Sequence, residues 1–308
     1  MSKAPFVIQP DLTAVAIAYR NQNLIHEKVL PVLPVGKQDF KYQEHTKADG
    51  FTVPDTRVGR KGKPNEVEFT QTEKTSSTVD YGLDYPIPQS DIDNSGDGYD
   101  PRKRAVEGIM DLVKLDREKR VADLIFAAGT YPSGNKVQLS GTDQFSDFSN
   151  SKPIIKITDA LETPILRPNI AVIGRSVWAK LRQHPDLVKS IFGNNQNAGL
   201  ITLMQFKELF ELNEVVVGDA WINTAKPGQT ASYSRVWGKH MAFLHHASSL
   251  ASGVATFGFT AQFGQPIGSQ NEDANIGLRG GVVVRAGESV KEVISASDLG
   301  YFIQDAIA

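Results

Sequence analysis

The chain has 308 residues, no cysteine, and a formal net charge of −2 from 33 basic and 35 acidic residues. Without cysteine it can form no disulfide, thiolate nucleophile or cysteine-bound metal site. The near-zero charge argues against a protein that coats phosphate backbones, and no stretch approaches the roughly eighteen apolar residues of a membrane span. We therefore expect a folded cytoplasmic protein, long enough for one large or two ordinary domains.

Residues 1–36 are predicted to form an extended N-terminal arm. A short helical segment is expected over residues 11–20, and Pro31 and Pro34 impose extended backbone on the apolar segment 29–34. An extended apolar segment cannot bury its own side chains, so this arm needs a partner surface.

Residues 37–99 are predicted to form a long extended loop built on a β-hairpin. Gly59, Gly62 and Pro64 supply turn residues between its two sides. An isolated hairpin is only marginally stable in water, so we expect a neighbouring copy of the same protein to support it. The prediction rests on apolar residues that alternate with polar ones, as in a strand with two faces: Phe40, Tyr42, Val67, Phe69, Val79, Tyr81, Leu83 and Tyr85.

The tip of this loop carries the one basic cluster in the chain that invites a functional interpretation, Arg57, Arg60, Lys61 and Lys63. One interpretation is a contact with an acidic surface on a neighbouring subunit, where a weak ion pair gains from repetition around a closed assembly. The other is a solvated hairpin end. The sequence leaves both open.

A long helix is predicted over residues 101–128, with Asp100 as its N-cap and Pro101 in its first turn. At 1.5 Å per residue it would reach roughly 40 Å. The acidic residues Asp91, Asp93 and Asp97 before it lack the spacing of a calcium loop, so a linker is favoured there. The helix prediction rests on apolar residues at three- and four-residue steps: Val106, Ile109, Met110, Val113, Val121, Leu124 and Ile125.

Helix and strand patterns alternate over residues 153–225, which predicts a compact lobe of mixed structure. It contains a buried strand at 169–173 and a helix from Ser176, its expected cap, to Leu181. After Ser232 the patterns predict strands at 235–244, 256–263 and 282–294, the last interrupted at Gly287. The fold class is therefore expected to be α+β.

No catalytic, cofactor or metal site is predicted. None of the six histidines has metal-ligand spacing, and the adjacent His245 and His246 would point to opposite faces of a strand. The segment 174–178 lacks the second glycine of a nucleophile elbow, so Ser176 is interpreted as a helix cap.

Several segments resemble the major capsid proteins of tailed bacteriophages, which have the Hong Kong 97 (HK97-like) fold. The resemblance covers nearly the whole chain in the order arm, hairpin, long helix, lobe and returning strands. The segments that carry it are DYGLDYPIP at 80–88, DREKRVADL at 116–124, PNIAVIG at 168–174, RVWGKH at 235–240, and GLRGG at 277–281 leading to ESVKE at 288–292.

The resemblance implies a division of the chain into five parts. An N-terminal arm (1–36) and an extended loop (37–99) would precede a peripheral domain (100–159) built on the long spine helix. An axial domain (160–275) would meet its copies around five- and six-fold centres, and residues 276–308 would return to the peripheral domain. Asn194 and Asn195 would then lie in a loop near such a centre, as a further intersubunit contact.

The implied function is a structural, non-enzymatic subunit of an icosahedral virion shell, assembled from pentamers and hexamers in the host cytoplasm. The shell would enclose double-stranded DNA without sequence-specific binding. Implied partners are a portal, a possible decoration protein and a separate scaffolding protein, since the chain starts almost at the arm. No cofactor or membrane is expected. Two alternatives stay open: an encapsulin-like nanocompartment shell, and an α/β hydrolase that uses Ser176 or His240.

Overall fold

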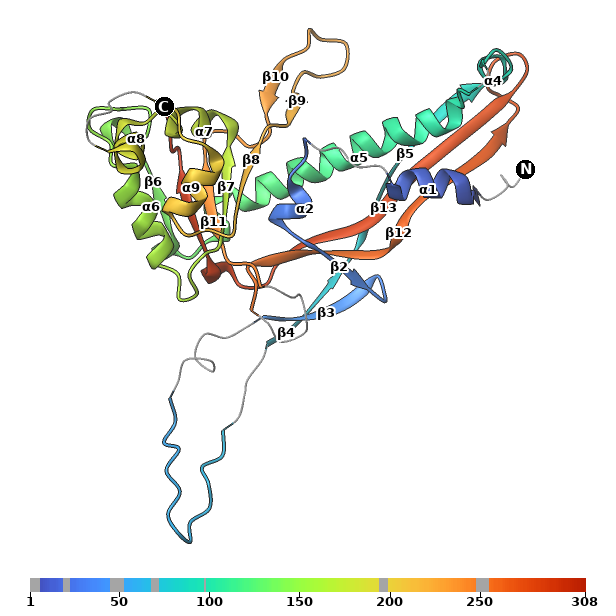
Figure 1. Cartoon of the computed structure of the whole chain (residues 1–308). Helices are drawn as coiled ribbons and strands as arrows, with labels where there is room; N and C mark the ends of the chain where they lie inside the picture. Colours follow the sequence, from blue (N-terminus) through green and yellow to red (C-terminus); the bar gives the residue numbers. More distant parts are fainter. Residues whose placement is uncertain are drawn as a thin grey trace.

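The computed structural model describes residues 6–18, 23–44, 53–67, 72–96, 98–193, 199–247 and 255–308. Figure 1 shows a mixed lobe at one end of a long helix, α5 (Pro101–Ile125), which runs along extended strands to the far end of the molecule. A narrow loop leaves the junction of these parts and points away from both. The α+β class is thus confirmed.

The long helix lies on a sheet in which the strand order is β1–β12–β13–β5, with β2 also paired to β12. Val106, Met110 and Val113 of α5 pack with Val284 and Ala286 of the sheet, because the apolar stripe of the helix faces the strands. The elements are β1 (Val7–Ile8), α1 (Pro10–Ala18), α2 (His26–Val29), β2 (Val32–Val35), β5 (Val79–Pro88), α4 (Gln89–Asp93), β12 (Gly258–Asp273) and β13 (Gly281–Ile294).

Two predictions about these elements are wrong. The helix ends at Ile125 rather than at residue 128, because Phe126 leaves helical geometry and packs edge-on against Trp237. The strand β13 is not interrupted at Gly287. A Cβ there would lie 2.3 Å from the carbonyl oxygen of Tyr81, so the glycine permits a close approach of two strands instead of ending one.

The lobe is built on a second sheet, in the order β6–β14–β11–β7–β8. All five residues of β7 are buried, which matches the continuous apolar run of a strand covered on both faces. The elements are β6 (Lys136–Gln138), α6 (Pro153–Glu162), β7 (Ile170–Gly174), α7 (Arg175–Leu181), α8 (Pro185–Phe192), α9 (Leu203–Leu209), β8 (Glu214–Gly218), β11 (Met241–Leu244) and β14 (Gly300–Gln304), with short 3-10 turns at Ala128–Thr130, Ser133–Asn135, Gly141–Asp143 and Ser297–Leu299.

The predicted strand 235–244 is two strands. β10 (Tyr233–Arg235) pairs with β9 (Trp221–Asn223) in a hairpin that stands off the lobe, whereas β11 lies inside the lobe sheet. The chain turns between them because Trp237 is drawn into the core and Gly238 has a φ of 42°.

At the base of the extended loop β3 (Asp39–Glu44) runs antiparallel to β4 (Thr72–Ser77), and the described residues 53–67 farther out form no strand. The hairpin is therefore shorter than predicted. Its last apolar residues belong to β5, which pairs with β13 over ten positions, because that neighbour extends the long sheet. The base is held by Phe40, which packs with Phe259 and Val293.

Strand pairing crosses the predicted domain boundaries. β12, which lies within the segment 160–275, is in the long sheet beside the helix, and β14, within 276–308, is in the lobe sheet between β6 and β11. The long sheet and the lobe sheet are thus each completed by strands from distant segments of the chain.

Candidate assembly surfaces

The tip of the extended loop carries the four predicted cationic residues, and all described residues from 53 to 67 are exposed. A turn at Gly59, closed by a 2.8 Å bond from the Gly62 N–H to the Gly59 carbonyl, brings Arg57, Arg60, Lys61 and Lys63 together. The structure therefore gathers these cations at one exposed end. Asn194 and Asn195 lie outside the described residues.

One polar contact joins the two sides of the tip, and two others lie within a side. The Asn65 side-chain amide donates to the Asp55 carbonyl at 2.8 Å, and the Arg57 N–H donates to the Asp55 carboxylate at 3.0 Å. Lys63 pairs with Glu66. Because this segment holds four cationic and two anionic side chains, it keeps a positive balance at its outermost point.

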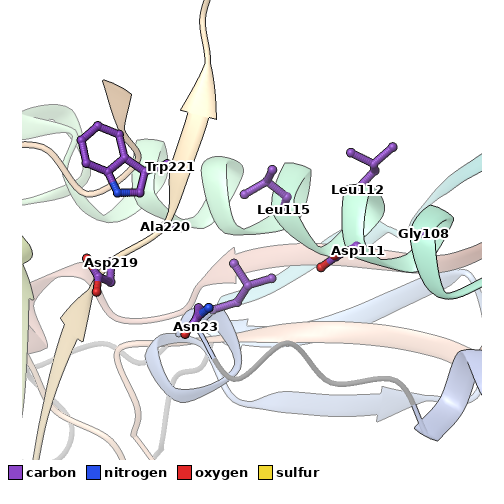
Figure 2. A pocket seen from close by; sticks show the side chains of 9 residues that line it. Asn23, Gly108, Asp111, Leu112, Leu115, Asp219, Ala220 and Trp221 are labelled. Carbon is purple, nitrogen blue, oxygen red and sulfur yellow. The ribbon is translucent and has the colours of Figure 1, made fainter. Parts of the chain in front are cut away.

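A groove of about 640 Å³ lies between α5, the base of the β9–β10 hairpin and the arm (Figure 2). Its lining combines polar residues with exposed apolar ones, among which Leu112 is 57% and Trp221 50% exposed. The Arg235 guanidinium lies 4.3 Å from the centre of the Trp221 ring and pairs with Asp219 at 2.5 Å. Arg235 thus already provides a cation to both Trp221 and Asp219, and the exposed side chains of Leu112 and Trp221 make the groove suited to an extended segment with apolar side chains. Sequence analysis missed it, although Leu112 falls outside the buried stripe of the helix.

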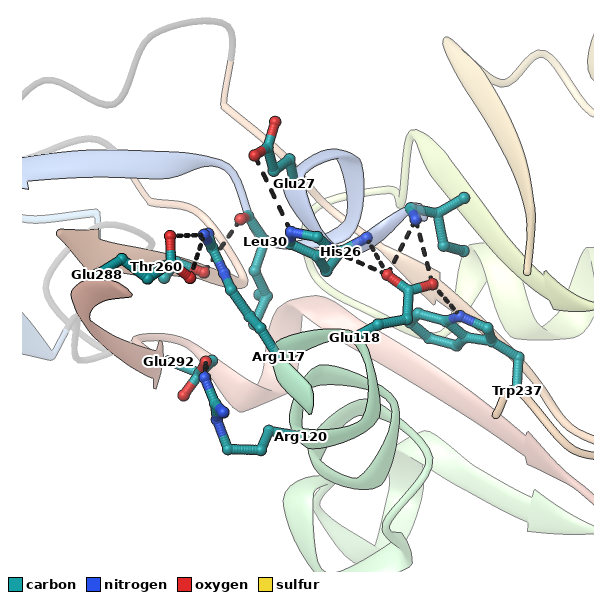
Figure 3. Close-up of polar contacts among 11 residues, drawn as sticks. His26, Glu27, Leu30, Arg117, Glu118, Arg120, Trp237, Thr260, Glu288 and Glu292 are labelled. Carbon is teal, nitrogen blue, oxygen red and sulfur yellow. Dashed lines mark hydrogen bonds and ion pairs between the residues drawn. The ribbon is translucent and has the colours of Figure 1, made fainter. Parts of the chain in front are cut away.

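Beneath these surfaces, a buried carboxylate joins three distant segments (Figure 3). Glu118 of α5 is fully buried and accepts bonds from the backbone N–H groups of Ile25, at 2.9 and 3.1 Å, and His26, at 2.8 Å. It also bonds the His26 imidazole Nδ1 and accepts from the Trp237 indole, at 2.9 and 2.5 Å. We call these residues the Glu118 hub. It fixes the arm, the helix and the lobe relative to one another.

The helix is tied to the long sheet by two further charged pairs (Figure 3). Arg117 lies 3.4 Å from Glu288, and both side chains are almost fully buried. Arg120 pairs with Glu292 at 3.0 Å and lies 3.7 Å from the centre of the Tyr81 ring. Breaking the Arg117–Glu288 pair would leave an uncompensated buried charge, so this contact favours one alignment of helix and strands.

The residues considered for chemistry do not form a catalytic arrangement. The Ser176 hydroxyl donates to the Gly238 carbonyl at 2.9 Å, and the cap position is Gly174, so its prediction as a helix cap is wrong. His240 accepts from the Asp305 N–H at 2.9 Å, and burial lowers the pKa of its imidazole. In the part of the chain that the structure describes, no hydrogen bond joins Ser176 to His240.

His245 and His246 follow the end of β11. The His245 Nδ1 lies 2.9 Å from the Arg167 carbonyl, while His246 is buried and its pKa is lowered to about 4 by burial. Among the described residues, no group of three or more histidine, aspartate and glutamate side chains could hold a metal ion. No helix in those same ranges is long and apolar enough to cross a membrane.

Comparison with known proteins identifies the family to which the chain belongs. No family model matches the chain. It is 51% identical to the major capsid protein of Pseudomonas phage JBD67 over 310 aligned residues, which cover all of both chains. The chain belongs to the phage major capsid proteins. It therefore forms the capsid shell of a virion from many copies of itself, as the resemblance in its sequence implied.

Solved structures agree with the fold expected for a phage major capsid protein. A phage-related protein from Bordetella bronchiseptica has a TM-score of 0.77 at 24% identity, covering 98% of both chains. An encapsulin from Synechococcus elongatus has a TM-score of 0.52 at 10% identity, covering 97% of this chain and 96% of its own. The HK97-like fold is thus confirmed. Because both kinds of shell share it, the phage assignment rests on sequence identity rather than on the fold.

Proposed function

We propose that this major capsid protein closes into an icosahedral shell of pentamers and hexamers around double-stranded DNA, and that the extended loop braces each subunit on its neighbour. The part built on α5 would be peripheral and the lobe axial, with lobe tips meeting at the symmetry centres. Assembly would take place in the host cytoplasm, and the subunit would have no enzymatic activity.

The exposure of the loop carries this proposal. Described residues 53–67 form no helix or strand and bury no side chain within the subunit. Val53 is 91% exposed and Val58 51%, so the loop presents apolar as well as cationic groups. A segment with so few internal contacts loses conformational freedom when it is ordered, and contacts with another molecule must offset that loss.

A neighbouring copy offers suitable contacts. The groove beside Leu112 and Trp221 offers exposed apolar side chains that could receive the apolar residues of the loop, Val53 and Val58. One exposed ion pair stabilises by only about 0 to 1 kcal/mol, but a closed shell repeats each contact at every subunit. Stable interfaces bury about 1,600 Å² in total, so the loop would add area to contacts made by the body of the subunit.

The low net charge of the chain suits a shell protein that encloses DNA without binding it tightly. Proteins that bind nucleic acid tightly neutralise many phosphates, which requires a strongly basic surface. With a net charge of −2, this subunit would contact packaged DNA only as its enclosure, with no preference for sequence.

The proposal is tested by shortening the loop. Replacing residues 53–67 by an Asn-Gly turn retains β3 and β4, and the variant should stay soluble and folded but fail to form closed particles. Deleting residues 45–75, which also removes part of β4, should have the same result. Negative-stain microscopy of both, beside the unmodified protein, makes the comparison.

A matched control removes a different projection. Replacing the turn at 225–230 of the β9–β10 hairpin by Asn-Gly shortens an exposed segment that lies outside the proposed brace. Closed shells from this control but not from the loop variants support the proposal. Intact shells from the loop variants contradict it.

A nanocompartment is the second candidate function, because the encapsulin similarity covers 97% of the chain. The two functions differ in content. Particles purified from infected or expressing cells should contain nuclease-resistant DNA if the shell encloses a genome, and a co-purifying cargo protein without DNA would favour the nanocompartment.

A further inference from the structure

The Glu118 hub gathers donors from two segments that are far apart in sequence. Ile25 and His26 belong to the arm, and Trp237 lies between β10 and β11 of the lobe (Figure 3). The carboxylate lies on the buried side of α5 among the apolar residues Val121 and Ile125, where an apolar side chain would pack without needing any partner. A carboxylate at this position must therefore be matched by donors to be tolerated.

The arm supplies those donors from the start of α2. The first N–H groups of a helix have no partner inside it, and the cap residue Ile25 makes no side-chain cap. Glu118 accepts from both Ile25 and His26 and so completes this end of the helix from another part of the chain. The arm can satisfy these N–H groups only in one position relative to α5.

Elsewhere the arm makes directional contacts with the long sheet: β2 pairs with β12 over residues 32–35, and the Thr260 hydroxyl donates to the Leu30 carbonyl at 3.2 Å. The remaining contacts of α2 with the long helix and the lobe are less selective. Val29 and Leu30 are fully buried among apolar side chains, which favour burial but not one orientation. The ion pair of Lys28 with Glu214 at 3.0 Å joins the arm to the lobe, but its side chains are 61% and 40% exposed. Among the contacts that place α2 on the long helix and the lobe, directional hydrogen bonds are thus concentrated in the hub.

We propose that Glu118 is a positioning residue for assembly: it sets the place of the N-terminal arm on the lobe and the long helix, so that every copy presents the same surfaces to its neighbours. The part of this proposal that concerns contacts between copies in the shell rests on the function proposed above. Its molecular part, the fixing of the arm, can be tested on the unassembled full-length subunit.

The test uses Glu118→Gln, which keeps the shape of the side chain but turns one acceptor into a donor facing other donors. Amide hydrogen exchange, followed by mass spectrometry, should be at least roughly tenfold faster over residues 24–31. Exchange over α6 should change by less than about twofold, because its buried residues Ile157 and Leu161 belong to a different core cluster from the hub. Lys28→Gln, which removes the exposed arm–lobe pair, is the matched control and should accelerate exchange over 24–31 by less than about threefold.

A milder variant covers the case in which Glu118→Gln does not fold. Trp237→Phe retains a buried ring and removes only the indole donor, so it should give a smaller acceleration confined to residues 24–31. Unchanged exchange there, or equal acceleration over 24–31 and α6, overturns the proposal in either variant, since equal acceleration is the pattern of a merely structural residue. The result does not depend on shell formation, so a failure of the proposed function would be seen separately, in the loop variants.

Discussion

The lobe and the extended loop differ in how far their side chains are buried. In the lobe, all five residues of β7 are buried, and helices and neighbouring strands cover both faces of its sheet. In the loop, every described residue from 53 to 67 is exposed and none of them belongs to a strand, whereas β3 and β4 pair at the base. The comparison teaches that this chain separates stability from association: one region holds the subunit together, and the other has groups to offer to another molecule.

The boundary between the two regions is sharp. Phe40 at the loop base is 9% exposed and packs with Phe259 and Val293, whereas Val53, farther along the loop, is 91% exposed. Burial therefore falls from nearly complete to nearly absent within about a dozen residues. Substitutions on the two sides of this boundary should differ in kind, and four of them test whether the separation holds.

The largest effect is expected in the lobe core. Phe243→Ala removes a fully buried ring from the middle of β11 and should lower the free energy of unfolding by about 3–5 kcal/mol. Urea unfolding of the unassembled subunit measures it. Leu278→Ala is the control, because Leu278 is fully exposed and its loss should cost less than about 0.5 kcal/mol. Equal effects would show that the lobe is not the stabilising region.

The second effect depends on pH. Burial lowers the pKa of His246 to about 4, while the unfolded chain has its ordinary value near 6.5. Above pH 6.5 the His246 imidazole is neutral in both the folded and the unfolded chain, and it does not lower the free energy of unfolding. As the pH falls from 6.5 towards 4, the imidazole binds a proton in the unfolded chain first, so the free energy of unfolding falls by about 3 kcal/mol. His246→Gln should flatten this part of the curve in urea titrations at several pH values. Parallel curves for the two proteins would contradict the assignment.

A smaller effect is expected where the loop joins the body. Phe40→Ala should cost roughly 2 kcal/mol, since the ring is buried at the edge of the long sheet. Lys41→Ala, one residue on, removes an exposed pair with Glu73 and should cost about 0 to 1 kcal/mol. If the two variants unfold at the same urea concentration, the loop base is not anchored as the structure indicates.

The smallest effect on the subunit is expected at the loop tip. Arg57→Glu with Arg60→Glu should leave the free energy of unfolding within about 0.5 kcal/mol. Assembly, followed by light scattering, should weaken more at roughly 0.05 M than at 0.5 M salt, because screening reduces both the lost attraction and the new repulsion. Lys207→Glu with Lys226→Glu makes the same change of charge on exposed residues of the lobe and serves as the control. Salt-independent assembly would identify the tip as solvated surface.

Local patterns predicted much of the fold. Asp100 was expected to cap the long helix, and its carboxylate accepts from the Arg102 N–H at 2.9 Å. The buried run of β7 and the alternation in β5 were likewise confirmed as strands. These signals could be found because a cap or a strand face is specified by residues a few positions apart.

Only part of the candidate site could be predicted from local sequence patterns. The cationic tip follows from turn residues and adjacent charges, so its exposure could be expected. Glu118 was not, because it stands in a run of charged residues and its partners lie 92 to 119 positions away. No local signal distinguishes a buried glutamate from its exposed neighbours on the same helix.

By itself, the sequence determined which segments are helical or extended, where the chain turns, and which family of proteins it resembles, since each depends on short-range spacing or on recognisable segments. Only the tertiary structure determined which strands pair and which buried groups bond to one another. β5 could have continued the hairpin but pairs with β13 about two hundred residues away, and Glu118 caps a helix of the arm. Such pairings are chosen by how much apolar area and how many hydrogen bonds the whole chain can satisfy at once, a competition that no local pattern records.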